Sequence, residues 1–376
     1  MKLLMLPGPG LVLAAVSAMA APLLLAPPWR VEAGPVLSVP RAAHQATLLD
    51  GGQVLVTGGC SGASCTPAER SAELIDGRTG RPAAVGPMQV ARVAHAAVRL
   101  GDGRVLVAGG WTGDATTASA EVFDPRTHRF AALGDMGGAR MDATLTLLSD
   151  GSALIAGGAA DTNRPLARAE VFEQNRFTAV GALRVARAHH AAVRLADGRV
   201  LVMGGLVARG RATASAEIYD PRTRTFSATG AMQMPRCKHA ALLLRDERVM
   251  VIAGSPDCNE QRRLAQTEIF DPRTGVFTPG PTLQNPRYKI VSAAALTADG
   301  DVVVAGDADD VEVWTPGAAA FAKARGFTGG ALAFSTATPL PGGALLIAGG
   351  YDGEILPTAR TWVVSRDGRP PVAGPR

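Results

Sequence analysis

The sequence has few aromatic side chains and no block of like charge. Phe, Trp and Tyr make up 5% of the 376 residues, and lysine and arginine are spread along the chain instead of forming a basic patch. With a net charge of only +5, the chain is a poor candidate for nucleic-acid binding. Glycine is plentiful, with 44 residues, as expected where many short strands are joined by tight turns. The length suits one large domain with its own core.

The N-terminus has the pattern of a secretory signal. Lys2 is followed by an apolar stretch over residues 11–19 and by an Ala-x-Ala cleavage pattern at residues 18–20. We therefore predict a signal peptide over residues 1–20, with an uncleaved anchor over residues 1–26 as the alternative. With the signal removed, the mature chain would carry no membrane span and would be periplasmic or extracellular.

The four cysteines are an even number, which in an exported chain favours two disulfides over free thiols. Cys60 and Cys65 are five residues apart within one loop. Cys237 and Cys258 remain to pair with each other. A bridge between these two would tie a long loop to its own part of the chain.

One pattern recurs down almost the whole chain. It consists of Arg-x-x-His, a short apolar stretch, Asp-Gly, and a Val- and Leu-rich run that ends in Gly-Gly. Its arginine stands at positions 41, 92, 140, 187, 236 and 287, in steps of 47 to 51 residues. The second copy predicts four strands, over residues 94–100, 104–108, 120–123 and 129–133. A period near 50 residues built from short strands is typical of a β-propeller.

The Gly-Gly pairs and their remnants predict seven blades. Their glycines are Gly59, Gly110, Gly158, Gly205, Gly254, Gly306 and Gly350. The last copy ends without a fourth strand, and Trp29–Ala33 stands at the right spacing before Arg41 to supply it. We therefore predict an all-β, seven-bladed propeller over residues 29–366, followed by a tail at residues 367–376. Its N-terminal strand would close the ring and remove the open sheet edge.

These repeats resemble the kelch family, in particular its bacterial exported members. The resemblance rests on the Gly-Gly after the second strand, on the Glu-Val-Phe-Asp segment at residues 121–124, and on Phe130 in the fourth strand. It covers residues 29–366, with phenylalanine in the last position where kelch repeats usually have tryptophan. The family implies the propeller fold but no particular ligand, because one propeller scaffold carries many unrelated functions.

An arginine and a glutamate recur together, which predicts a structural ion pair inside each blade. The arginines are Arg41, Arg92, Arg140, Arg187, Arg236 and Arg287, and the glutamates of the same repeats are Glu73, Glu121, Glu170, Glu217, Glu268 and Glu312. Repeat seven lacks both, with Ala331 and Thr361 in their places. An unpaired buried charge is costly, so a pair should be kept or lost as a unit. The alternative is that the arginines form an electropositive mouth for an acidic ligand.

Histidines follow the repeat arginine by three positions in four repeats, at His44, His95, His190 and His239. Because they are a feature of the repeat, we expect each to hydrogen-bond backbone in its own blade. Histidines spread around a ring do not converge as metal ligands must, so we predict no metal site and no cofactor. For His128 and His189 the sequence identifies no partner.

Kelch-type blades also occur in copper-radical oxidases, whose site needs a tyrosine linked to a cysteine. This chain has only Tyr219, Tyr288 and Tyr351, and its cysteines are expected in disulfides, so we reject that activity. Neither a Gly-x-Ser-x-Gly elbow nor a His-Glu-x-x-His motif occurs. Exported sialic-acid mutarotases of the same repeat family have six blades instead of seven, and they stay an alternative.

The loops between the second and third strands vary in length, and function usually lies on the variable loops of a rigid scaffold. The longest are in blades one and five, which also hold all four cysteines. We predict a depression between them, over blades six and seven, that binds sugar hydroxyls or Ca²⁺, although its acidic residues could equally form a solvated turn. The candidate residues are Asp307, Asp309, Asp310, Tyr351, Asp352, Glu354, Arg262, Arg263 and Trp111.

The sequence therefore predicts an exported, monomeric interaction module that presents this loop face to a protein or glycan partner. A carbohydrate-active enzyme, such as a sugar mutarotase or epimerase with its site on the same face, is the alternative.

Overall fold

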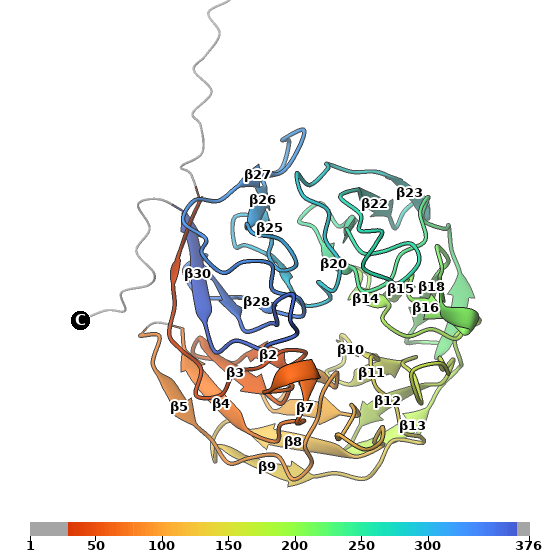
Figure 1. Ribbon diagram of the computed structural model, residues 1–376. Coiled ribbons are helices and arrows are strands. Elements are labelled where there is room, and N and C mark those ends of the chain that lie inside the picture. The colour runs from red at the N-terminus through yellow and green to blue at the C-terminus, as the bar shows by residue number, and fades with distance from the viewer. Residues whose placement is uncertain (1–28, 78, 367–376) are drawn as a thin grey trace, which may run out of the picture.

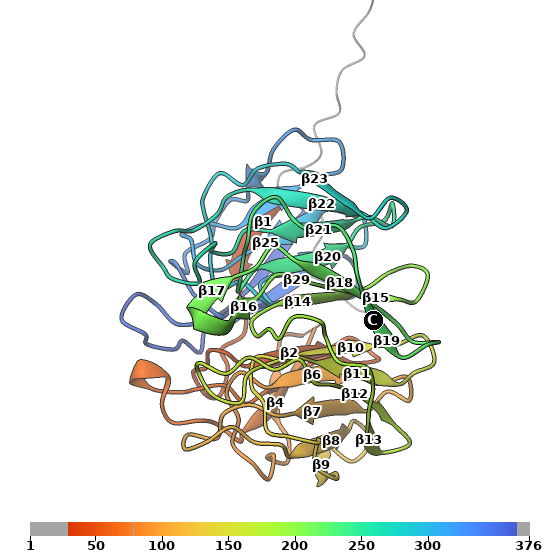
Figure 2. The same ribbon diagram turned by 90° about the vertical axis from the view of Figure 1, so that its right-hand side faces the viewer.

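Seven four-stranded antiparallel sheets stand in a ring in the computed structural model, which describes residues 29–77 and 79–366 (Figure 1). The predicted all-β, seven-bladed propeller is therefore confirmed. In six blades the strands pair in sequence order, from the innermost strand near the axis to the outermost at the rim, and in the seventh the outermost strand comes from the N-terminus. Figure 2 shows the same ring from the side, with the blades stacked around the axis.

The first four blades share one plan. Blade one contains β2 (Gln45–Leu48), β3 (Gln53–Thr57), β4 (Ala72–Asp76) and β5 (Pro82–Ala84), and blade two contains β6 (Ala96–Arg99), β7 (Val105–Ala108), β8 (Ala120–Asp124) and β9 (Arg129–Ala132). Blade three contains β10 (Thr144–Leu147), β11 (Ala153–Ala156), β12 (Ala169–Glu173) and β13 (Arg176–Ala179), and blade four contains β14 (Ala191–Arg194), β15 (Val200–Met203), β18 (Ala216–Asp220) and β19 (Thr225–Ala228).

The remaining blades follow the same order. Blade five contains β20 (Ala240–Leu243), β21 (Val249–Ile252), β22 (Thr267–Asp271) and β23 (Val276–Pro279), and blade six contains β24 (Ala294–Leu296), β25 (Val302–Val304), β26 (Glu312–Trp314) and β27 (Ala322–Lys323). Blade seven contains β28 (Thr336–Pro339), β29 (Leu345–Ala348), β30 (Thr361–Arg366) and β1 (Trp29–Ala33). The loops carry a small hairpin, β16 (Leu206–Val207) and β17 (Arg211–Ala212), and two 3-10 turns, η1 (Ala63–Cys65) and η2 (Ala208–Gly210).

The N-terminal strand closes the ring, as the repeat spacing predicted. β1 pairs antiparallel with β30, with Trp29 opposite Arg366 and Val31 opposite Val364. In Figure 1 the red β1 lies beside the blue β30, so the two ends of the described chain meet in one blade. The ring therefore leaves no first or last blade with an unpaired face.

The apolar core lies between neighbouring blades. All four residues of β7 are buried, and Val105 and Val107 pack in one cluster with Leu55 and Leu74 of blade one. Burial of a valine or leucine side chain contributes about 1.5–3 kcal/mol. Because the second strand of each blade is apolar on both faces, each blade needs a neighbour on either side, which the closed ring supplies.

The Gly-Gly pairs leave room for close contact between blades. Gly58 has a φ of +59°, and a Cβ on it would lie 2.7 Å from Cε1 of His95 in the next blade. Gly59 has a φ of +94°, and a Cβ there would lie 2.6 Å from the carbonyl oxygen of Ala42. A side chain at either position would collide with its neighbour, and a positive φ strains residues other than glycine.

In blade seven the position of the repeat glutamate is taken by Trp362, not by Thr361 as the sequence suggested. Trp362 stands opposite Ile347 in the strand pairing, as Glu73 stands opposite Val56 in blade one. Trp362 is 1% exposed and belongs to the apolar core between blades six and seven. The assignment from sequence was one residue off because this repeat has no charged residue to mark its alignment.

The arginine position of blade seven is likewise taken by Leu332, not by Ala331. The Leu332 carbonyl accepts a hydrogen bond from the Asp307 backbone N–H of blade six, as the Arg92 carbonyl accepts one from Gly59. Ala331 is exposed, whereas Leu332 is buried in the same cluster as the tryptophan described above. An apolar pair of positions thus replaces the charged pair of the other six blades.

Candidate functional site

The repeat arginines and glutamates form ion pairs inside their own blades. Nη2 of Arg92 lies 3.0 Å from Oε1 of Glu121, and both side chains are almost fully buried. Nη1 of Arg92 donates to the carbonyls of Gly109 and Ser119, at 2.8 and 2.9 Å. The Glu121 carboxylate also accepts a hydrogen bond from the backbone N–H of Val90. Both charged groups are therefore engaged within the blade.

The other five pairs repeat this geometry. They are Arg41–Glu73 at 3.1 Å, Arg187–Glu217 at 2.9 Å, Arg236–Glu268 at 2.6 Å, Arg287–Glu312 at 3.1 Å, and Arg140–Glu170. Because these arginine side chains are at most 1% exposed, they do not present an electropositive surface to an acidic ligand.

A ring of residues surrounds the axis on the face that carries the Gly-Gly loops. Each member stands two positions after the repeat arginine or its equivalent, and each has a left-handed backbone with φ between 50° and 56°. We call this set the mouth ring: Ala43, Ala94, Asp142, His189, Lys238, Lys289 and Phe334.

Backbone hydrogen bonds join the mouth ring from blade to blade. The N–H of Ala94 donates to the carbonyl of Ala43 at 3.1 Å, and the N–H of Phe334 donates to the carbonyl of Lys289 at 3.0 Å. A mouth-ring N–H donates in this way in six of the seven steps between blades, and the N–H of Ala43 closes the circle by donating to the carbonyl of Phe334. Only blade six differs, because Ile290 donates there in place of its neighbour. The side chains of the ring are thereby held at the axis on a rigid frame.

A cavity of about 230 Å³ lies on the axis below the mouth ring. Its wall is formed by the first strands of the blades and by residues such as Asp142, His189 and Phe334 of the ring. All four repeat histidines also line this axial cavity. None of the nine residues that the sequence proposed as a binding site does.

The repeat histidines bond to threonine side chains of the preceding blade, so the expected bonds to backbone within each blade were wrong. Nε2 of His95 lies 3.0 Å from Oγ1 of Thr57 in blade one, and Nε2 of His190 lies 2.9 Å from Oγ1 of Thr144 in blade three. Across the closure, His44 bonds in the same way to a threonine of blade seven, at 3.1 Å. These contacts link neighbouring blades around the axis.

His239 is the exception among the four histidines. The positions of blade four that correspond to the two threonine positions hold Ala191 and Met203, and neither offers a hydroxyl group. Within the described part of the chain, both ring nitrogens of His239 lack a hydrogen-bond partner. Burial lowers the pKa of His239 well below its usual value, so the ring is neutral at pH 7. A neutral, buried imidazole thus lines the axial cavity without a hydrogen-bond partner among the described residues.

Lys238 lies next to His239 on the mouth ring. Its ammonium nitrogen lies 5.3 Å from the centre of the Tyr288 ring and 5.6 Å from that of Phe334. Burial lowers the pKa of Lys238, and the neighbouring positive charge of Lys289 lowers it further, against the effect of nearby carboxylates. Among the described residues, Lys238 forms no ion pair with a carboxylate.

The second lysine of the ring is neutralised by the protein. The ammonium of Lys289 contacts the Glu260 carboxylate and lies 2.8 Å from the hydroxyl oxygen of Tyr351. Burial by itself lowers the pKa of Lys289, but the hydrogen bonds to Glu260 and Tyr351 have the larger combined effect and raise it. The two adjacent lysines therefore differ, because only Lys289 is matched by a carboxylate.

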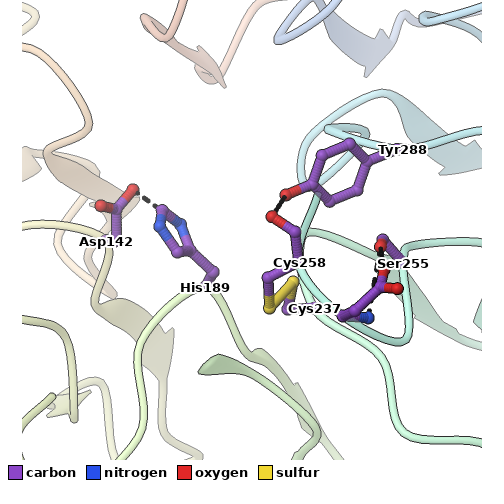
Figure 3. Close-up of a disulfide and its surroundings, with 7 residues drawn as sticks. Asp142, His189, Cys237, Ser255, Cys258 and Tyr288 are labelled. Carbon is purple, nitrogen blue, oxygen red and sulfur yellow. Dashed lines mark hydrogen bonds and ion pairs between the residues drawn. A yellow bond between two sulfur atoms is a disulfide. The ribbon is translucent and has the colours of Figure 1, made fainter. Parts of the chain in front are cut away.

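The opposite side of the mouth carries an acid–base pair and faces a disulfide. Nδ1 of His189 lies 3.1 Å from Oδ1 of Asp142, so His189 has a partner that the sequence did not reveal. Figure 3 shows this pair on one side and the Cys237–Cys258 bridge on the other, where the Tyr288 hydroxyl donates to the carbonyl of Cys258. The mouth is thus lined by polar groups from blades three to six.

The four cysteines form the two predicted disulfides, Cys60–Cys65 and Cys237–Cys258. Both lie in loops of the face that carries the mouth ring, in blades one and five. Two disulfides indicate an oxidising compartment.

Asp307 has a structural role in the backbone of blade six. It takes the place of the second glycine of the Gly-Gly pair, with a φ of +54°. Its Oδ2 accepts a hydrogen bond of 2.7 Å from the backbone N–H of Tyr288, a bond that a loop carbonyl accepts in the other blades. The carboxylate also lies 3.2 Å from Nη1 of Arg263. Burial raises the pKa of Asp307 to about 6.

Asp310 also has a structural role in blade six. It stands two positions before Glu312, where blades one, two and four have a serine, and it pairs with Arg287. Its other oxygen lies 2.7 Å from the ammonium of Lys323. Asp309 between them is exposed.

Three further candidates lie on exposed loops. Oδ1 of Asp352 accepts hydrogen bonds of 3.0 Å from the backbone N–H groups of Glu354 and Leu356, which is the behaviour of a turn residue. Glu354 itself is exposed, and Arg262 lies 3.6 Å from the carboxylate of Asp257. The contacts of Asp352 and Arg262 are thus made within their own loops.

The last two candidates, Trp111 and Tyr351, belong to one apolar cluster on the loop face. Tyr351 is buried in it together with Cys60, and Trp111, Phe334 and Cys65 are partly buried against it. The cluster, which we call the loop-face cluster, spans blades seven, one and two. It joins residues that are about 240 positions apart, which only closure of the ring brings together.

The sequence did contain a signal for the mouth ring. The position two after the repeat arginine reads Ala, Ala, Asp, His, Lys and Lys in the first six repeats. Four of these residues carry a charged or titratable group in a column that is otherwise small and apolar. Because this column varies between repeats, the positions that recur do not reveal it.

Within residues 29–77 and 79–366 no group of three or more His, Cys, Asp or Glu side chains is arranged to hold a metal ion. The same residues include no helix that is long and apolar enough to span a membrane.

Comparison with protein families finds the Kelch motif at residues 92–137 and 187–233, which are the second and fourth repeats. Comparison with curated proteins finds no match. The two matched repeats have the same four-stranded form as the other five blades, and all seven close into one ring. The chain is therefore a kelch-repeat β-propeller.

Proposed function

We propose that this propeller is an exported interaction module that binds a protein partner through its loop-face cluster. Kelch propellers generally serve as protein-interaction modules. The observation that carries the proposal is an apolar patch on the face where the Gly-Gly loops emerge. It combines the partly buried rings of Trp111 and Phe334 with exposed apolar side chains of the blade-seven loop.

The exposed part of this patch is formed by Ile355 and Leu356, which are 39% and 43% exposed. They follow Tyr351 of the loop-face cluster on the same short loop, directly after the charged residues Asp352 and Glu354. Aromatic and apolar residues surrounded by charged ones are typical of the centre and rim of a protein interface. The patch therefore suits a protein surface better than a polar sugar.

The patch is also held rigid before any partner binds. The Cys60–Cys65 bridge constrains the loop of blade one, and both cysteines belong to the loop-face cluster. A loop that is already ordered loses less conformational entropy on association, which favours affinity.

The size of the axial cavity also favours an interaction module over an enzyme that acts on long sugars. Its volume of about 230 Å³ is below the roughly 300–1,000 Å³ of most sites for drug-sized ligands. An oligosaccharide would need more space. An enzyme that acts on a chain of sugars in this cavity therefore has less support than an interaction module.

Export is part of this proposal. The two disulfides support an oxidising compartment, outside the cytoplasm. The signal peptide expected at residues 1–20 lies outside the described residues. N-terminal sequencing of the secreted protein tests it, because a start at residue 21 supports cleavage and an intact N-terminus contradicts it.

The test of the partner uses a photo-reactive amino acid in place of Ile355, in the full chain produced by its own cells. A matched control places the same group at Val276, which is 52% exposed on the outer strand β23 of blade five. We expect a protein crosslinked from position 355 and not from position 276. Binding of that purified protein should weaken when Trp111→Ala or Leu356→Asp is introduced. Equal crosslinking from both positions, or unchanged binding by both variants, contradicts the proposal.

A further inference from the structure

The histidines around the axis follow a rule that is broken once. Where a blade presents a threonine hydroxyl near the axis, on its first or second strand, the next blade presents a histidine, as with Thr57 and His95. Where a blade presents only apolar groups at these positions, the next blade has no histidine, as with Ala240 before Ile290. His239 breaks the rule, because its neighbours in blade four are Ala191 and Met203.

An orphaned polar group in a cavity calls for a partner from outside the protein. Buried side-chain nitrogen and oxygen atoms nearly always have a hydrogen-bond partner in folded proteins, from the chain or from a bound molecule. Both nitrogens of His239 lack one within the described residues, the side chain is fully buried, and it lines the axial cavity. His239 is therefore placed to bond to a molecule in the cavity.

The charge at the mouth specifies what kind of molecule this is. Lys238 precedes His239 in the chain and lies over Phe334, which lines the same cavity. Lys289 is neutralised by Glu260, and Asp142 is shared with His189 across the mouth (Figure 3). Among the described residues, the ammonium of Lys238 thus has carboxylates nearby but none in direct contact, and a ligand that carries a single negative charge would supply one.

The size of the cavity limits the ligand further. Its volume of about 230 Å³ corresponds to roughly eight water molecules at ~30 Å³ each. Much of its wall is small and apolar, with alanines at positions 43, 94, 143 and 191. A small acid fits this space, whereas an oligosaccharide or a nucleotide does not.

We propose that the axial cavity binds a small hydroxy- or oxo-monocarboxylate, whose carboxylate pairs with Lys238 and whose hydroxyl or carbonyl oxygen bonds to His239. The neutral imidazole offers one N–H donor and one acceptor nitrogen, so it accommodates either group. The ligand enters through the mouth ring from the loop face. This site does not depend on a protein partner at the loop-face cluster.

Calorimetric titration of the full chain at pH 7 and low salt tests the proposal with four probes. Lactate carries both a carboxylate and a hydroxyl, propionate lacks the hydroxyl, lactamide lacks the charge, and inorganic phosphate is a different anion. We expect lactate to bind most tightly, propionate at least about tenfold more weakly, and lactamide and phosphate more weakly still. Equal binding of lactate and lactamide, or no heat with lactate at any concentration, overturns the proposal.

Variants assign the two contacts separately. Lys238→Met should weaken lactate and propionate alike, whereas Lys323→Met, a lysine on the outer strand β27, should change neither. His239→Leu should remove the preference for lactate over propionate. Lactate binding that is unchanged in Lys238→Met overturns the proposal.

A second variant keeps the test valid if His239→Leu does not fold. Ala191→Thr places a hydroxyl at the position from which Thr144 bonds to His190. His239 would then have a partner within the protein, and lactate should lose its advantage over propionate while the fold is retained. An undiminished preference for lactate in this variant shows that His239 does not contact the ligand.

Discussion

Leu332 and Trp362 occupy in blade seven the two positions at which the other six blades hold a buried arginine and glutamate. Both are buried in the apolar core that blade seven shares with blade six. The propeller therefore tolerates an apolar pair where it usually has an ion pair. What it does not contain, among the described residues, is one member of the charged pair without the other.

We predict that breaking one pair costs more than removing it. Arg92→Leu leaves the Glu121 carboxylate buried without its partner, which should lower the free energy of unfolding by about 3–5 kcal/mol. The double variant Arg92→Leu/Glu121→Leu should lose less than the single variant. Urea unfolding measures both, with the exposed Arg126→Leu as control. A double variant less stable than Arg92→Leu contradicts this account of the pair.

The orphaned His239 leads to a stabilising substitution. Ala191→Thr should add one hydrogen bond between blades four and five and raise the free energy of unfolding by about 1 kcal/mol. The matched control is Ala240→Thr, which places the same hydroxyl in the apolar cluster that contains Ile290 and should destabilise. Thermal unfolding in the absence of ligands distinguishes them. If both variants are destabilised alike, the threonine–histidine contact does not stabilise the ring.

The two disulfides should contribute unequally to stability. The Cys237–Cys258 bridge joins residues 21 positions apart, and Cys60–Cys65 joins residues five apart. Loop-closure entropy of the unfolded chain then gives about 3 kcal/mol for the first bridge and about 2 kcal/mol for the second. Paired Cys→Ser variants, compared by melting temperature, should show the larger loss for blade five. The reverse order would mean that contacts in the folded state dominate.

The axial histidines make the protein sensitive to acid. Burial lowers the pKa of His44, His95 and His190 to about 3. In the unfolded chain these groups titrate near pH 6.5, so below that pH the unfolded state binds more protons and the folded state loses stability as the pH falls. The loss should be about 2 kcal/mol per histidine at pH 5.

Urea unfolding at pH 7.5 and pH 5 measures this loss. His95→Gln should reduce the difference in the free energy of unfolding between the two pH values by about 2 kcal/mol, the contribution of one histidine. The substitution His128→Gln, at an exposed position, should leave this difference unchanged. If His95→Gln leaves the dependence unchanged, other groups are responsible for the sensitivity to acid.

Repetition made the blades predictable, because each copy confirms the alignment of the others. The same method failed where a copy has lost its marker residues, as at Leu332 and Trp362 in blade seven. In blade six, the sequence proposed Asp307 as a binding residue because it stands with Asp309 and Asp310 in an acidic group on a short loop. Its actual role, to accept the Tyr288 N–H that a loop carbonyl accepts elsewhere, depends on the register of that one blade.

Partners on another blade could not be predicted from the repeat. The spacing shows that His95 recurs at a fixed place, but not that its partner, Thr57, is 38 residues earlier in blade one. The arginines differ, because their glutamates belong to the same repeat and are lost together with them. Two residues that contact each other within one repeat are therefore kept or lost together in that repeat. Two residues that contact each other between repeats show this only when each repeat is compared with the next.

By itself the sequence determined the architecture, the number of blades, the closing strand and the pairing of the cysteines, because all of these depend on local spacing. Only the tertiary structure decided which residues share a site. Closing seven blades around one axis brings Lys238 and His239 to the mouth of a cavity whose other wall comes from residues such as Asp142, and it joins Trp111 to Tyr351 across the first and last blades. These neighbours are distant in the chain, so their proximity is a property of the closed ring and not of any one repeat.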